Sequence, residues 1–177
     1  YKYGHQKIND VDVLNGGFAT HCHLKEGTAI FRLPKSLSFK EAAPLNCTHA
    51  TIAGALRLAG DIKDKNVLVL GAGMLGISAC AMAKEYGAKY VFVNDINLER
   101  LSIAVDFGVE KSFNAGISVD EIKLLLANYG EIDVVIDSTG VPEVMENGIE
   151  MLGIGGVAVW VGAVYSAREV KISAENI

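Results

Sequence analysis

The sequence lacks any long uninterrupted hydrophobic run and any excess of basic residues. Residues 67–83 are largely apolar and carry no charge, but Gly71, Gly73 and Gly76 interrupt them. A bilayer-spanning helix needs about 20 apolar residues without such helix-weakening interruptions, so we expect no membrane association. The net charge of −5 is opposite in sign to the basic surfaces that bind phosphate backbones, so we expect no nucleic-acid partner.

Cysteines are few, and the sequence contains no internal repeat. Cys22, Cys47 and Cys80 form an odd number at wide spacing, which favours reduced thiols over a disulfide framework. No signal peptide is recognisable, and together these features predict a cytoplasmic protein. The chain starts at Tyr1 and stops at Ile177 without an obvious end, so we expect a fragment of a longer protein.

The composition, 50% hydrophobic and 21% charged, is that of an ordinary globular protein with one sizeable core. The pattern changes near residue 45. Before that point, residues 16–34 predict two short antiparallel strands around a turn at residues 26–27. After it, small apolar residues over 46–59 predict a buried helix that ends at Gly60.

Beyond residue 60 the sequence alternates between short β-rich runs and helical segments. The runs "VLVL", "DVVID" and "VAVWV" are apolar throughout, which is typical of parallel strands covered on both faces. Strands separated by helices pair in parallel through right-handed crossovers, so we predict the α/β class with a Rossmann-type doubly wound parallel sheet. Strands are expected at 66–70, 89–94, 111–114, 132–137 and 156–162, and helices at 74–86, 97–107, 118–129 and 142–152.

The loop after the first of these strands has the spacing G-x-G-x-x-G, at Gly71, Gly73 and Gly76. In a strand–loop–helix unit the first glycine permits a tight turn, the second lets a pyrophosphate approach the backbone, and the third lets the helix pack against the strand. The N–H groups of Gly73, Met74 and Leu75 would then point at the phosphates from the positive end of the helix dipole. The loop predicts a dinucleotide cradle, and a plain glycine turn is the alternative.

Asp95 ends the next predicted strand, about 20 residues beyond the loop. A carboxylate at this point can accept both ribose hydroxyls of NAD and would repel the 2′-phosphate of NADP. NAD is therefore the expected cofactor. The alternative is an aspartate that only caps the following helix.

A long segment from residue 46 to residue 108, which includes "NCTHATIAGALRLAGDIKDKNVLVLGAGMLGI", resembles the medium-chain zinc-dependent alcohol dehydrogenases. The upstream "GGFATHCHL" resembles that family's strand near the active site, and "DVVIDSTG" and "VWVGAV" resemble its fourth and fifth Rossmann strands. "YGH" with "GGFATHCHL" also resembles, more loosely, a subgroup that accompanies phosphonate breakdown. The resemblance implies a remnant of a GroES-like catalytic domain over residues 1–45 and an NAD-binding domain, incomplete at its C-terminus, over residues 46–177.

The same resemblance implies roles for Cys47 and Thr51. Cys47 occupies the position of a cysteine that is one of three protein ligands of the family's catalytic zinc, and three protein ligands leave a fourth place for a substrate oxygen. Thr51 lies one helical turn later on the same face and matches a threonine near the nicotinamide. The alternative for Cys47 is a small buried hydrophobic residue, which is also what we expect of Cys22 and Cys80.

Further cofactor contacts are implied by the resemblance. Arg100 matches a basic residue at the adenosine ribose, and a solvated helix face is its alternative. Small residues at strand ends match positions that line the adenosine and nicotinamide sites, namely Ser138, Thr139, Val161 and Ala163.

The function implied is NAD-dependent, zinc-assisted hydride transfer between an alcohol and a carbonyl, in a homo-oligomeric full-length protein with a small-molecule substrate. The other zinc ligands are expected upstream of Tyr1, so this chain alone should bind dinucleotide weakly and catalyse nothing. Two alternatives stay open. One is a non-catalytic dinucleotide-binding module in which Cys47 is structural, and the other is a zinc-free relative of the quinone reductases, which Cys47 and Asp95 disfavour.

Overall fold

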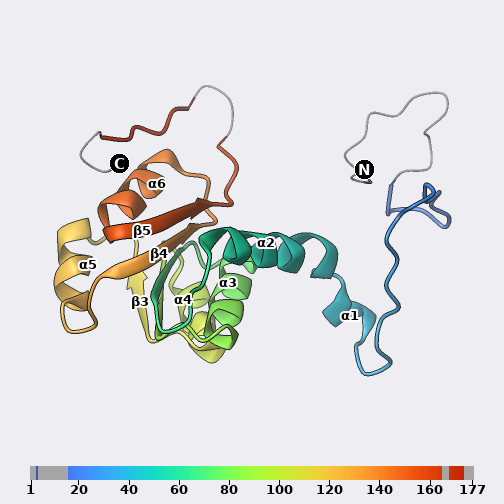
Figure 1. Cartoon of the computed structure of the whole chain (residues 1–177), viewed down its shortest axis with the longest axis horizontal. Coiled ribbons are helices and arrows are strands. Elements are labelled where there is room, and N and C mark those ends of the chain that lie inside the picture. The colour runs from blue at the N-terminus through green and yellow to red at the C-terminus, as the bar shows by residue number, and fades with distance from the viewer. Residues whose placement is uncertain (1–2, 4–15, 165–167, 174–177) are drawn as a thin grey trace. The chain divides into compact units, whose positions relative to one another are not determined.

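The computed structural model describes Tyr3, residues 16–164 and residues 168–173, and it divides the chain into two compact units. The first unit covers residues 1–38 and the second covers residues 39–177. All helices and strands of the described chain belong to the second unit (Figure 1). The assignment of the first part of the chain to a catalytic domain stays a prediction.

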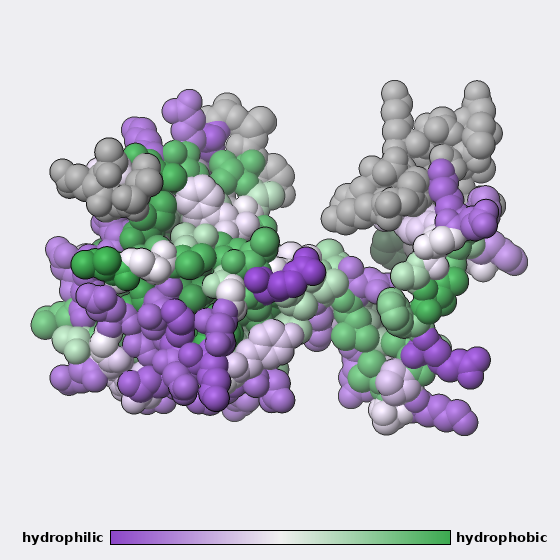
Figure 2. Space-filling model, in the orientation of Figure 1, coloured by the Kyte–Doolittle hydropathy of each residue, from purple (hydrophilic) through white to green (hydrophobic). Residues whose placement is uncertain are grey.

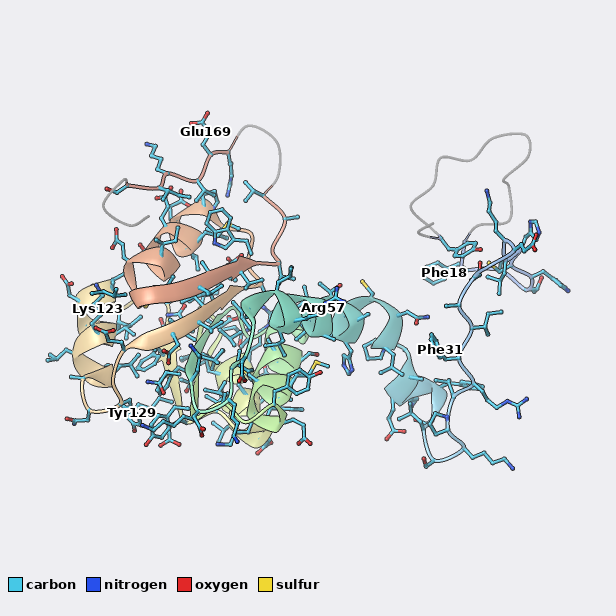
Figure 3. All side chains as sticks on the ribbon, viewed as in Figure 1. Phe18, Phe31, Arg57, Lys123, Tyr129 and Glu169 are labelled. Carbon is cyan, nitrogen blue, oxygen red and sulfur yellow. The ribbon has the colours of Figure 1, made fainter. Side chains whose placement is uncertain are left out.

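The first unit has no strand among residues 16–38, so the expectation of two antiparallel strands there was wrong. The turn is present, because the N–H of Thr28 donates to the carbonyl of Lys25 at 3.1 Å. The flanking side chains are exposed, including those of Phe18 and Phe31, which project from the ribbon in Figure 3. Short strands are stable only with a paired backbone and a covered face, and the described residues of this unit provide neither.

The second unit is built on a five-stranded parallel sheet. Its strands are β1 (Asn66–Leu70), β2 (Tyr90–Asp95), β3 (Lys111–Asn114), β4 (Ile132–Asp137) and β5 (Leu152–Trp160). They lie in the order β3-β2-β1-β4-β5, and every neighbouring pair is parallel. The central strand β1 pairs on both sides, so Val67 lies opposite both Val91 and Val134. This confirms the doubly wound α/β class.

Helices alternate with these strands. They are α1 (Phe39–Ala42), the π-helical turn η1 (Leu45–His49), α2 (Ala50–Ala59), α3 (Met74–Glu85), α4 (Leu98–Ala104), the 3-10 turn η2 (Val105–Phe107), α5 (Val119–Leu126) and α6 (Pro142–Glu150). The helix expected over 46–59 therefore begins as a wider π turn, in which the N–H of His49 reaches the Pro44 carbonyl. β5 starts earlier than expected, because its first residues pair with β4 through a register shift, and it ends at Trp160.

Alternate residues of each strand point to opposite faces of the sheet, and helices cover both faces. Val67 and Val69 of β1 pack beneath α2, α3 and α4, whereas Leu68 and Leu70 pack with α5. Gly148 of α6 adjoins Leu70 on that second face. Figure 1 shows the helices in two layers on either side of the strands. Because both faces are covered, the strands are apolar throughout, as their sequences indicate.

No described helix combines the length and apolar character that crossing a bilayer requires. Figure 2 shows polar side chains over much of the visible surface of this unit, with apolar side chains between them. On the edge strand β5, Ile154 and Val157 are exposed. This edge of the sheet therefore carries apolar side chains that the described residues leave in solvent.

The two cysteines expected in a core differ in burial. Cys22 is exposed, so that expectation was wrong, and its segment has no covering layer among the described residues of its unit. Cys80 is fully buried in α3 where that helix faces the sheet. Burial raises the pKa of the Cys80 thiol from its ordinary value of 9.0 to about 12, because a thiolate there has no water around it.

This shift predicts an alkaline loss of stability. Between pH 9.0 and about 12 the unfolded chain releases the Cys80 proton and the folded chain keeps it, so the free energy of unfolding falls as pH rises, by about 1.4 kcal/mol per pH unit from this group. Urea unfolding at several pH values from 9 to 11 measures the slope. In Cys80→Ala, where the other titrating groups are unchanged, the slope should be smaller by about that amount. Equal slopes would contradict the prediction.

Candidate functional site

The carboxyl ends of β1, β2 and β4 meet at one edge of the sheet, where the glycine loop (residues 71–76) leads from β1 into α3. The N–H of Gly71 donates to the Asn94 carbonyl at 2.7 Å and continues the pairing with β2 into the loop. On the other side, the N–H of Ser138 donates to the Leu70 carbonyl at 2.9 Å. The glycine loop is therefore held between the ends of two neighbouring strands.

Two of the three glycines are required by the local geometry. Gly71 has a φ of 92°, in the left-handed region, and a Cβ at this position would lie 2.8 Å from Ser138 Oγ. A Cβ on Gly76 would lie 1.7 Å from the carbonyl oxygen of Gly71. Only glycine at both positions allows α3 to begin this close to β1.

Gly73 differs from the other two. Its φ of −72° and ψ of −170° are open to any residue, and a Cβ there would meet no atom within 4 Å. Neither the backbone nor the described neighbours therefore require glycine at this position. The first N–H groups of α3, which begins directly after Gly73, have no partner within the helix. The glycine loop thus fits an anionic group that comes close to the backbone, such as a pyrophosphate.

Asp95, the last residue of β2, is buried, and backbone groups bind both of its carboxylate oxygens. Oδ2 accepts from the N–H of Ala72 in the glycine loop at 2.6 Å, and Oδ1 accepts from the N–H of Asn97 at 2.7 Å. Each oxygen retains a further lone pair for another donor. Asp95 therefore anchors the glycine loop and still offers acceptors to a ligand.

The cap of α4 is Asn97, so the interpretation of Asp95 as only a capping residue was wrong. The Asn97 side chain accepts from the N–H groups of Glu99 and Arg100, at 2.9 and 3.1 Å. Arg100 Nη1 lies 4.0 Å from Asp95 Oδ2, and its side chain is 56% exposed. Because the two atoms are 4.0 Å apart and the Arg100 side chain is mostly exposed, the pair adds little stability, and the guanidinium is available for a ligand beside the buried carboxylate.

A cavity of about 290 Å³ lies between the glycine loop, the end of β2 and the start of α6. Six predicted site residues line it together, namely Gly71, Gly73, Asp95, Arg100, Ser138 and Thr139. The other lining residues were not predicted from the sequence; they are Asn94, Ile96, Ala115, Val141 and Val144. Their signal was positional, because ligands of open α/β sheets bind outside the carboxyl ends of the strands and these residues lie there.

The Ser138 and Thr139 hydroxyls bind within this edge of the sheet. Ser138 Oγ donates to the Leu70 carbonyl at 2.9 Å, and Thr139 Oγ1 donates to Asp137 Oδ1 at 2.6 Å. Asp137 is fully buried and also accepts from the N–H groups of Thr139 and Gly140, each at 3.1 Å. Sequence analysis missed Asp137, although a carboxylate as the last residue of an apolar strand was a usable signal.

Five predicted cofactor contacts do not line this cavity, and one of them, Gly76, packs against the Gly71 carbonyl. Met74 and Leu75 are the first residues of α3. Val161 and Ala163 follow β5, and the N–H of Val161 donates to the Asp137 carbonyl at 2.8 Å. Contact of these five residues with a cofactor stays a prediction.

Cys47 and Thr51 lie on the helical segment η1–α2, which packs against α3. Cys47 is exposed, so its interpretation as a buried hydrophobic residue was wrong. Thr51 is exposed as well. Within the part of the chain that the structure describes, no three His, Cys, Asp or Glu side chains are placed to hold a metal ion. The described residues by themselves therefore do not form a complete zinc site, and Cys47 is a single candidate ligand.

A second cavity, of about 390 Å³, lies at the opposite end of the sheet, between the C-terminal half of α5 and the starts of β4 and β5. Lys123, labelled in Figure 3, is on its rim together with Glu131. None of the predicted site residues lines it. Because ligands of this sheet type bind at the carboxyl ends of the strands, the smaller cavity is the candidate site.

Comparison with known proteins finds relatives that match most of this chain over part of their own length. A sequence profile of zinc-binding dehydrogenases matches residues 75–177. Galactitol 1-phosphate 5-dehydrogenase of Escherichia coli K12 is 30% identical over 140 residues, which are 78% of this chain and 40% of that protein. L-threonine 3-dehydrogenase of Idiomarina loihiensis is 30% identical over 83% of this chain and 42% of its own. The crystal structure of E. coli galactitol-1-phosphate dehydrogenase superposes with a TM-score of 0.72 at 27% identity, covering 82% of this chain and 42% of its own. The chain thus spans about two fifths of the length of these relatives.

The two glycine roles predict opposite responses to alanine. Gly76→Ala forces a Cβ onto the Gly71 carbonyl oxygen and should lower the free energy of unfolding by about 3 kcal/mol or more. Gly73→Ala enters open space and should change it by no more than about 1 kcal/mol. Urea denaturation followed by circular dichroism measures both. Equal losses in the two variants would refute the distinction.

Proposed function

The chain belongs to the zinc-binding dehydrogenase family, and from this premise we propose that it forms the NAD-binding part of a dehydrogenase that interconverts an alcohol and a carbonyl compound. Bound NAD accepts or returns a hydride at its nicotinamide, and the protein binds and orients it. One observation carries the proposal. At Gly73 the glycine loop leaves its backbone open at the start of α3, between two glycines that packing requires.

The parts of NAD have distinct places in this proposal. The pyrophosphate lies at the N–H groups of Gly73, Met74 and Leu75, where the positive end of the α3 dipole favours negative charge. The adenosine occupies the 290 Å³ cavity, where Ile96 and Val144 offer apolar surface. Ser138 and Thr139 border it, and Val161 and Ala163 lie toward the nicotinamide. The chain's own task is to bind the dinucleotide in an extended form.

Asp95 is the proposed basis for preferring NAD to NADP. Its carboxylate borders the cavity and would accept the ribose hydroxyls of NAD. The same buried negative charge would lie against the 2′-phosphate of NADP and repel it. Arg100, beside this carboxylate, is proposed to contact the ribose from the solvent side.

Cys47 is proposed as one ligand of the zinc for which the family is named, with Thr51 one helical turn further along. Support comes from the exposed thiol on a segment that packs against α3. The remaining ligands would lie outside the described residues, which gather no cluster of three. For that reason no chemical step is assigned to zinc here.

For the whole protein we propose a small-molecule alcohol or carbonyl as substrate. The two relatives reported above are named for a sugar-alcohol phosphate and for a hydroxylated amino acid. Polyols and amino alcohols are therefore the first compounds to test. The first unit, residues 1–38, is proposed as part of the catalytic domain of that protein.

If the glycine loop binds the pyrophosphate, a substitution at Gly73 should weaken NADH binding without unfolding the chain. Calorimetric titration of this chain should detect NADH, and Gly73→Ala should weaken NADH binding at least about tenfold, because the methyl group occupies the space next to the pyrophosphate. Gly54→Ala is the matched control, since a Cβ on Gly54 in α2 also meets no atom within 4 Å and Gly54 does not line the cavity. Undiminished NADH binding in Gly73→Ala would exclude the cradle as the binding site.

The Asp95 proposal predicts a change of cofactor preference. In Asp95→Asn the repulsive charge is removed, so the ratio of NADH to NADPH affinity should fall about tenfold or more. Some stability should also be lost, because the amide oxygen can accept from only one of Ala72 and Asn97 and the NH₂ group cannot accept from the other. Asp106→Asn, which changes an exposed carboxylate in η2, should leave the ratio unchanged. A ratio that stays constant in Asp95→Asn would show that this carboxylate does not select the cofactor.

A further inference from the structure

A buried threonine that the proposed function does not use connects the Cys47 turn to the glycine loop. Thr48 follows Cys47 directly in η1 and is 7% exposed. Its hydroxyl donates to the thioether sulfur of Met74 at 3.2 Å. Met74 is the first residue of α3 and belongs to the glycine loop. One side-chain contact therefore joins the two parts of the site, far apart in the sequence.

The surroundings of the contact indicate that it has a specific role. Met74 is 65% exposed, so burial of its side chain among the described residues does not explain a large apolar residue at this position. A thioether is a weak acceptor, yet it is the partner of a buried hydroxyl. Core packing therefore does not account for Met74, and the Thr48 hydroxyl has its sulfur as a partner.

The π-helical form of η1 is an independent observation. The N–H of Ala50 reaches back to the Leu45 carbonyl, which widens the turn. In this turn Thr48 is buried while the adjacent Cys47 is exposed. Isolated π turns are rare and frequently occur at functional sites. The turn thus presents the thiol outward while its neighbour is fixed to the glycine loop.

We propose that Thr48 is a positioning residue that, through the Met74 sulfur, couples occupancy of the glycine loop to the environment of the Cys47 thiol. The inference rests on the proposed function for the identity of the ligand of the loop, a nucleoside diphosphate. Displacement of Met74 by a bound diphosphate moves the Thr48 contact and with it the turn that carries Cys47. Coupling of this kind is reciprocal, so the state of Cys47 also changes the affinity of the loop for its ligand.

The test uses ADP as the probe, because ADP carries the adenosine and diphosphate but no nicotinamide that could cover Cys47 directly. The readout is the rate of Cys47 alkylation by iodoacetamide at fixed pH with a chelator present, in a Cys22→Ser background. Cys80 is buried and does not compete. Saturating ADP, with binding verified by calorimetry, should change the rate about fivefold or more. In Thr48→Val the change in alkylation rate on ADP binding should fall below about twofold. Thr48→Ser keeps the hydroxyl, so in that variant ADP should again change the rate about fivefold or more.

Two further variants keep the proposal falsifiable if Thr48→Val does not fold. Met74→Leu removes the sulfur acceptor at similar volume on a mostly exposed side chain, and it should abolish the coupling. Ser78→Ala is the matched control, since Ser78 Oγ donates to the backbone carbonyl of Met74 at 2.8 Å and its loss should leave the coupling intact. If ADP binds but the alkylation rate does not change, or if Met74→Leu keeps the full change, the inference is overturned while the proposed function stands. If neither ADP nor NADH binds, the proposed function itself fails.

Discussion

The structure depends on the close approach of α3 to the end of β1, where Gly76 lies against the carbonyl oxygen of Gly71. No side chain fits between these two backbones. Because α3 starts there, its unpaired N–H groups open at the edge of the sheet between β2 and β4 rather than over a covered face. The location of the cavity, the open face at Gly73 and the contact with η1 all follow from that starting point.

Two buried carboxylates stabilise the same edge. Asp95 and Asp137 are the last residues of the strands on either side of β1, and both are at most 7% exposed. Burying a carboxylate is costly unless hydrogen bonds satisfy it, and in both cases backbone N–H groups of loops do so. Asp95 thereby fixes the glycine loop, and Asp137 fixes the turn into α6. The candidate site is thus held in place before any ligand arrives.

The cavity and the proposed metal site differ in how much of each the described residues form. The cavity and the glycine loop are formed within the second unit by elements that the sheet aligns. The thiol proposed for the metal is on a single turn, with no cluster of ligands near it among the described residues. This chain covers about two fifths of the length of its relatives. Dinucleotide binding is therefore the activity for which this chain carries its own structural basis.

Three features of the second unit could be predicted from the sequence: the order of strands and helices, the G-x-G-x-x-G loop and the acid at the end of β2. These are local patterns, since period, glycine spacing and strand-end position are set by residues close together in the chain. Tertiary structure alone decided the remainder. Residues 16–34 have strand-like composition but form no strand in the described structure, because pairing depends on partners and not on the segment. The Asp95 contact with Ala72 and the Thr48 contact with Met74 were not predictable either, because each joins residues that only the folded sheet brings together.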